Sequence, residues 1–210
     1  LERCITAFER LIDQGFNFQV RLAISRGEWQ RERGNAQAAV ETLEPVHAEL
    51  RHEDRLMRQW FGSALAEAYL AAGRHADALR VAERVISIGN EPEGPIVMPR
   101  LRCRRIAAIA IGELGEPERA RDLLTKALAQ AEGLDFPPLA SAIHEGLARL
   151  ALAESDAATY HHHANEMMRW TKPTKNPALM GFAERLLDAG KALSEAVGEA
   201  DEVPTRIDTA

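Results

Sequence analysis

Cysteine, aromatic residues and long hydrophobic runs are all scarce in this sequence of 210 residues. The two cysteines, Cys4 and Cys103, follow no metal-ligand spacing, so we expect buried, reduced thiols and a cytoplasmic location. No apolar run approaches the roughly 18 residues of a membrane span, and no segment has the pattern of a signal peptide. The formal net charge of −6 disfavours a nucleic-acid or membrane-surface role, because such surfaces need a basic excess.

Motifs for catalysis and for cofactor or metal binding are also missing. The sequence has neither a GxxxxGK[ST] phosphate loop nor a GxGxxG after a strand. Ser141 and His144 lie three residues apart, but they lack the strand–turn elbow that exposes a nucleophile. His144 is not followed by a second histidine at the spacing of zinc hydrolases. We therefore predict a non-enzyme without cofactor or metal, with any catalytic activity in a domain outside this chain. Because the chain begins at Leu1 within helix-like sequence, we expect it to be part of a longer protein.

The sequence does contain a repeated frame of small residues. The stretches RERGNAQAAVETL, LAAGRHADALRVA and GELGEPERARDLL each carry a glycine followed five residues later by an alanine. Each glycine is also preceded by a small residue seven positions earlier. The three copies, in the order small residue, glycine and alanine, are Gly27, Gly34 and Ala39; Ala66, Gly73 and Ala78; and Ala108, Gly115 and Ala120. A fourth, degraded copy has Ala148, Ser155 and Tyr160.

This frame predicts pairs of antiparallel helices. Small residues let two helices approach closely, and a glycine ends the first helix in the left-handed conformation without a Cβ penalty. Apolar residues nine and twelve positions after each turn continue a helical stripe, and no segment indicates a β-strand. The turns recur at a period of about 40 residues, which is typical of a helical-repeat array.

We predict an all-α chain of about ten helices. The expected ranges are 2–13, 17–33, 36–51, 55–72, 75–88, 98–114, 117–132, 139–154, 157–170 and 177–196. The predicted repeat domain covers 1–197, and 198–210 form a flexible tail. Within the domain we assign a half repeat to 1–15, repeats to 16–53, 54–95, 96–136 and 137–172, and a capping helix to 177–196.

The small–turn–alanine frame resembles tetratricopeptide (TPR) repeats over about 16–170. Units near 40 residues are similar to the extended variety found in bacterial signalling proteins, such as the MalT-like activators. The closing TKPTKNPALMGFAERLLDAG also resembles the end of repeat regions attached to some bacterial serine/threonine kinases. The chain departs from a regular consensus, because the tyrosine expected four residues before the turn occurs only as Tyr69. The resemblance implies a right-handed α-solenoid that binds a protein or peptide segment in its concave groove.

Counting back from each turn carries the family's ligand-facing positions onto this chain. The resemblance implies a partner-binding groove that contains Arg21, Glu28, Arg31, Trp60, Glu67, Arg102, Arg105, Glu145 and Arg149. Arginines beside an aromatic anchor are typical of binding hot spots, and they favour a partner with acidic groups. The alternative interpretation is that the glutamates pair with the arginines of neighbouring helices and that Trp60 belongs to the core.

Two function classes remain open for such a groove. One is a protein- or peptide-binding scaffold of a larger bacterial signalling protein. The other is a sensor domain of a transcriptional activator or kinase, which binds a small ligand or peptide. Self-association through the ends of the solenoid is a further alternative. The basic segment MPRLRCRR spreads its arginines over different faces of a helix, so we predict no nucleic-acid partner and no membrane partner.

Three consecutive histidines, His161 to His163, fall in the degraded fourth copy. Side chains that follow one another on a helix fan out by about 100° per residue and cannot converge on one ion. We therefore predict no metal site there and place the histidines on the outer faces of the last repeat. Tyr160 stands where the other copies carry alanine, so we expect it to be buried, to widen the gap between the two helices of this pair and to change the repeat into a cap.

Overall fold

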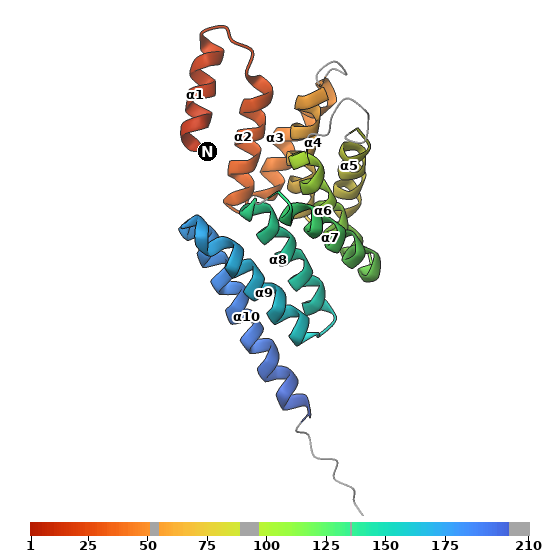
Figure 1. Cartoon of the computed structure of the whole chain (residues 1–210). Coiled ribbons are helices and arrows are strands. Elements are labelled where there is room, and N and C mark those ends of the chain that lie inside the picture. The colour runs from red at the N-terminus through yellow and green to blue at the C-terminus, as the bar shows by residue number, and fades with distance from the viewer. Residues whose placement is uncertain (51–54, 89–96, 135, 202–210) are drawn as a thin grey trace, which may run out of the picture. The chain divides into compact units, whose positions relative to one another are not determined.

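The computed structural model describes residues 1–50, 55–88, 97–134 and 136–201. Within these ranges the chain forms ten α-helices and one short 3₁₀ helix, and none of it is strand (Figure 1). The all-α prediction is therefore confirmed. The elements are α1 (Glu2–Asp13), α2 (Gln19–Glu32), α3 (Ala36–Glu49), α4 (Arg55–Ala71), α5 (His75–Ile88), α6 (Val97–Glu113), α7 (Pro117–Glu132), α8 (Pro137–Ala153), α9 (Ala157–Thr171), η1 (Lys172–Thr174) and α10 (Pro177–Asp201).

The predicted helix ends agree with the observed ones to within about two residues, apart from the last helix. α10 continues to Asp201, whereas we predicted an end at 196 and a flexible tail from 198. The rest of the predicted tail, 202–210, lies outside the described residues. None of the described helices has the length and apolar character that a bilayer-spanning helix requires.

The four turns take the backbone conformation that the repeat frame predicts. Gly34, Gly73 and Gly115 have φ angles of +81°, +71° and +95°. Ser155, which replaces glycine in the degraded copy, has a φ of +58°. The left-handed conformation is therefore kept in the fourth pair, although a side chain with a Cβ makes it less favourable there.

Small residues of the frame lie at tight contacts between helices. A Cβ on Gly27 of α2 would lie 2.7 Å from Cδ1 of Leu43 on α3, so only glycine fits. The alanines that follow the turns, Ala39, Ala78 and Ala120, are completely buried. The structure therefore places these small residues at the helix contacts that the sequence predicts for them.

The chain divides into two compact units, 1–123 and 124–210, with the boundary inside α7. In the first unit α2, α4 and α6 lie side by side, because α4 packs against both of the other two. α3 packs against α2 and α4, and α5 packs against α4 and α6, which gives a second layer. The core between these layers includes Phe61, Leu65 and Ile106, all fully buried.

In the second unit α9 packs against both α8 and α10. Tyr160 of α9 is 1% exposed and lies in a cluster with Ala148, Ala151 and Ala164, against Leu186 and Leu187 of α10. Its hydroxyl donates a hydrogen bond of 2.7 Å to the carbonyl oxygen of Leu186. The expected burial of Tyr160 is therefore confirmed, and its partner is the last helix.

The ring of Tyr160 leaves no space for a side chain at the buried Gly190 of α10. A Cβ there would lie 2.6 Å from Cε1 of Tyr160 and 2.8 Å from Cε1 of His161. We predict that Gly190→Ala lowers the free energy of unfolding by about 1–3 kcal/mol, the usual effect of overpacking. Gly181→Ala on the same helix is the control, since the nearest atom would be Arg185 Nη1 at 3.7 Å. The control should gain up to about 1 kcal/mol through helix propensity. Chemical denaturation of both variants measures the difference, and equal effects at the two sites would contradict this packing.

Candidate binding surface

A charged network lies on the α2, α4 and α6 layer of the first unit. Arg102 of α6 donates hydrogen bonds to Glu28 of α2 at 2.7 Å and to Glu67 of α4 at 3.2 Å. Arg105 of α6 donates to both carboxylate oxygens of Glu67. Four of the predicted groove residues therefore meet, and they come from three helices that are distant in sequence.

Burial makes this network strongly coupled. Glu67 and Arg105 are 9% and 8% exposed. Burial alone would raise the pKa of Glu67, but the charges of Arg105 and Arg102, the hydrogen bond from Arg105 and the charge of Arg31 lower it to about 2. Burial alone would lower the pKa of Arg102, and the charges of Glu67 and Glu28 raise it instead. Glu67 and Arg102 are therefore both ionised at neutral pH.

The other predicted groove residues make none of these hydrogen bonds, although the charge of Arg31 acts on Glu67. Arg21 is exposed on α2, with its guanidinium 5.4 Å from the centre of the Phe18 ring. Arg31 is half-buried and lies 3.7 Å from Glu32. In the second unit, Glu145 and Arg149 form an ion pair of 2.5 Å along α8. The alternative interpretation, in which glutamates pair with arginines of neighbouring helices, thus describes the contacts of Glu28, Glu67, Arg102 and Arg105, whereas Glu145 and Arg149 pair within one helix.

Trp60 does not belong to the core. It is 40% exposed on α4, and Leu56, one turn earlier, is 49% exposed. Residues four apart share one helix face, so the two side chains form an exposed apolar pair. Glu67 lies two turns after Trp60 on that face. We name the surface formed by Leu56, Trp60, Glu67, Glu28 and Arg102 the inner face. Leu56 was missed in the sequence, although its spacing from Trp60 was a usable signal.

The consecutive histidines are arranged differently from the prediction. Only His162 is exposed, so placing all three on outer faces was wrong. His163 meets the buried His144 of α8, and their Nδ1 atoms are 3.1 Å apart. The buried Nε2 of His144 has no hydrogen-bond partner among the described residues. This favours the tautomer in which His144 Nδ1–H donates to His163 Nδ1, because an unpaired acceptor is less costly than an unpaired donor.

No group of three or more metal-ligating side chains occurs in the part of the chain that the structure describes. Two of the cavities among the described residues have volumes of about 230 Å³ and about 530 Å³. Neither is lined by a predicted groove residue. The first is lined by residues of α3, α4 and α5, and the second by residues of α9 and α10.

The burial of Glu67 and Arg105 leads to a first prediction for this surface. Glu67→Gln removes the charge that compensates a buried arginine, so we expect a loss of about 3–5 kcal/mol in the free energy of unfolding. Glu145→Gln is the matched control, because its partner Arg149 is exposed and such pairs contribute less than about 1 kcal/mol. Urea denaturation at neutral pH measures both. Similar losses for the two variants would show that the network contributes no more than a surface pair.

The histidine pair leads to a second prediction. Burial lowers the pKa of both His144 and His163 to about 4 from an ordinary 6.5. Between these pH values the unfolded chain takes up protons that the folded chain does not, so the free energy of unfolding falls as the pH falls from 6.5 to 4.

The double variant His144→Asn with His163→Asn keeps polar groups near both Nδ1 positions but cannot titrate. We expect it to show a shallower pH dependence of the urea midpoint in this window. His162→Asn, at an exposed position, should behave as the unmodified protein. An unchanged slope in the double variant would rule out this pair as the cause.

Comparisons with known proteins place the fold. No protein-family model matches the sequence, and no curated protein matches it. Among solved structures, a Rap protein complexed with Competence and Sporulation Factor superposes with a TM-score of 0.76 at 16% identity, over 89% of this chain. This chain spans only 52% of the length of that protein.

Two further structures match over most of their own length. A putative kinesin light chain with nearly identical TPR-like repeats, from Podosopora anserina, has a TM-score of 0.58 at 23% identity. That match covers 89% of this chain and 92% of the other. BtubC (BKLC) from P. vanneervenii has a TM-score of 0.60 at 18% identity. That match covers 100% of this chain and 94% of BtubC. At these identities the likeness concerns the fold.

Proposed function

We propose that this chain, which has the fold of tetratricopeptide-like repeat proteins, binds a protein or peptide segment on the inner face of its first unit. We further propose that it serves as a scaffold module of a larger bacterial signalling or regulatory protein in the cytoplasm. Reduced cysteines fit that location, and Cys4 and Cys103 are free thiols. Cys103 is buried as expected, whereas the expected burial of Cys4 was wrong, because this residue is exposed on α1. In this proposal, any catalytic activity belongs to a domain outside the chain.

The observation that carries the proposal is the exposed pair Leu56 and Trp60 beside a compensated charged network. Aromatic residues that stand out of a surface next to arginines are typical of binding hot spots. The fold supports the same interpretation, since the similar Rap protein was solved in complex with a bound factor. A partner would bury Trp60 and Leu56 and contact the ionised groups at the edge of the network.

The network also changes which residues should attract an acidic partner. Arg102 and Arg105 already donate to Glu28 and Glu67, so little of their charge is available to a ligand. We therefore assign the main anchoring to Trp60 and Leu56. An attraction for acidic groups would come from Arg21, which is exposed, and from Arg31, which is half-buried.

A sensor role remains the second candidate. The observation in its favour is the cavity of about 230 Å³ between α3, α4 and α5, which is large enough for a small ligand. That cavity is lined by none of the predicted groove residues. A sensor that uses it would bind its ligand away from the inner face.

A peptide selection tests the proposal. The immobilised chain is exposed to a random-peptide phage library, and the enriched peptides are synthesised and titrated by calorimetry. We expect Trp60→Ala to weaken binding by about 30-fold, the effect of losing a hot-spot aromatic. Phe136→Ala is the control, because Phe136 is also 40% exposed but lies in the second unit.

The test avoids charge reversal of Arg102 and Arg105, because that change would break buried ion pairs and confuse binding with folding. Circular dichroism confirms that both aromatic variants keep the helical fold. The proposal is abandoned if no peptide is enriched above the uncoated surface, or if Trp60→Ala binds the selected peptides as well as the control does.

A further inference from the structure

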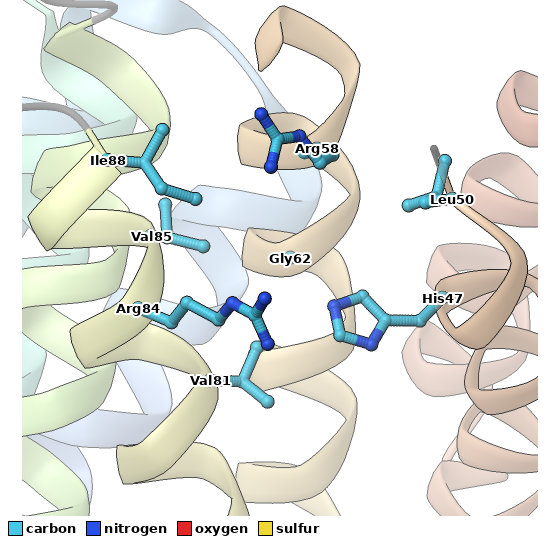
Figure 2. A pocket seen from close by; sticks show the side chains of 8 residues that line it. All are labelled: His47, Leu50, Arg58, Gly62, Val81, Arg84, Val85 and Ile88. Carbon is cyan, nitrogen blue, oxygen red and sulfur yellow. The ribbon is translucent and has the colours of Figure 1, made fainter. Parts of the chain in front are cut away.

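A cavity of about 230 Å³ lies between α3, α4 and α5, entirely within the first unit (Figure 2). It is lined by His47, Leu50, Arg58, Gly62, Val81, Arg84, Val85 and Ile88. Figure 2 shows Arg84 reaching from α5 and His47 from α3 toward one another, with Arg58 of α4 above them. Two guanidinium groups and an imidazole thus lie around one small space.

The lining combines positive charge with an apolar wall. Among the described residues that line the cavity, none is acidic. Arg84 makes no ion pair with the described residues, whereas Arg80, one turn earlier on α5, pairs with Asp77 at 2.7 Å. Val81 and Val85 are buried and form part of the wall, and Leu50 and Ile88 extend it. A ligand that satisfies both parts carries a negative charge on an apolar group.

His47 is held in place at this cavity. Its ring stacks on Phe61 with 6.0 Å between ring centres and an angle of 17°. Burial, and then the charges of Arg84 and Arg80, lower the pKa of His47. The imidazole is therefore neutral at pH 7 and can donate one hydrogen bond to an anion. The positive charges of Arg84 and Arg80 disfavour protonation of His47, and a bound anion would reduce their effect.

The cavity and the inner face are on different sides of α4. Arg58 and Gly62 line the cavity, whereas Leu56 and Trp60 are exposed on the inner face. Positions two apart on a helix differ by about 200° in direction, which places these two pairs on opposite sides. A ligand in the cavity would thus not compete with a partner bound at Trp60.

We propose that this cavity binds a carboxylate that carries a short aliphatic group. The carboxylate would lie against the guanidinium group of Arg84 and accept a hydrogen bond from His47. The aliphatic group would pack against Val81 and Val85. Charge-assisted hydrogen bonds from guanidinium groups are the strong ones, and they favour carboxylate geometry. The volume, below the roughly 300–1,000 Å³ of drug-sized pockets, restricts the ligand to a few carbon atoms beside the acid.

Two sources share this chemistry: a free short-chain acid, and the C-terminal carboxylate of a peptide that ends in an aliphatic residue. Hexanoate represents the first source and N-acetyl-leucine the second. The neutral analogue 1-hexanol tests whether the charge is needed. Binding is followed on the full chain by NMR, through the methyl signals of Val81 and Val85. The acid that binds more tightly identifies the source.

Two matched variants test the role of the charge at the cavity. Arg84→Gln should weaken binding of the preferred acid by about tenfold or more, the usual effect of losing a charge-assisted hydrogen bond. Arg80→Gln removes a charge from the same helix at a position that does not line the cavity, and it should change binding by less than about twofold. Trp60→Ala should leave acid binding unchanged, which keeps this test separate from that of the inner face.

Saturable binding of either acid, weakened in Arg84→Gln and not in Arg80→Gln, supports the proposal. It is overturned if neither acid binds, if 1-hexanol binds as well as hexanoate, or if the two arginine variants lose binding equally. Because Arg84 is exposed and has no ion pair with the described residues, its replacement is not expected to disturb folding.

Discussion

The structure depends on the close approach of helices at residues with little or no side chain. Gly27 faces Leu43 between α2 and α3, and Gly62 faces Val85 between α4 and α5, where a Cβ would lie 2.5 Å from Val85 Cγ2. At both contacts a methyl group on the glycine would collide with a buried side chain. Core side chains in a densely packed interior cannot move aside freely, so these contacts determine how near the two layers of the first unit come. They also position the outward-facing residues of α4, on which both proposed sites depend.

The inner face and the cavity are two results of the same arrangement. On one side of α4, Glu67 is paired with arginines of α6, and the apolar side chains of Trp60 and Leu56 are exposed to solvent. On the other side, the absence of a side chain at Gly62 brings α5 near enough for Arg84 to face His47. A single helix thus presents an apolar anchor to a macromolecule and a cationic lining to a small acid. This division follows from the alternation of large, small and charged residues along α4.

The elements of this fold were largely predictable from the sequence because the signals are local. The turn residues, including Ser155, and the buried alanines follow from a spacing that any one repeat contains. The pairing of the groove arginines was not predictable, since the choice between a partner and an internal carboxylate depends on which helices meet. For the same reason the sequence did not reveal that His163 lies against His144, or that Arg84 shares a cavity with His47. The length of α10 was misjudged because its last residues are polar and carry no helical stripe.

The hydrogen bond from Arg102 to Glu28 joins residues that are separated by 74 positions, and it links the first helix pair to the third without passing through the second. Helical-repeat arrays are usually stabilised only by contacts between adjacent repeats, so that their ends can unfold one repeat at a time. Here the carboxylate of α2 is tied to α6, and fraying of the first pair would leave the guanidinium of Arg102 with one carboxylate fewer. Local opening of the first helix pair therefore costs Arg102, in the third pair, its ion pair with Glu28. Opening of the first helix pair is therefore coupled to the third pair, beyond the stacking of adjacent repeats.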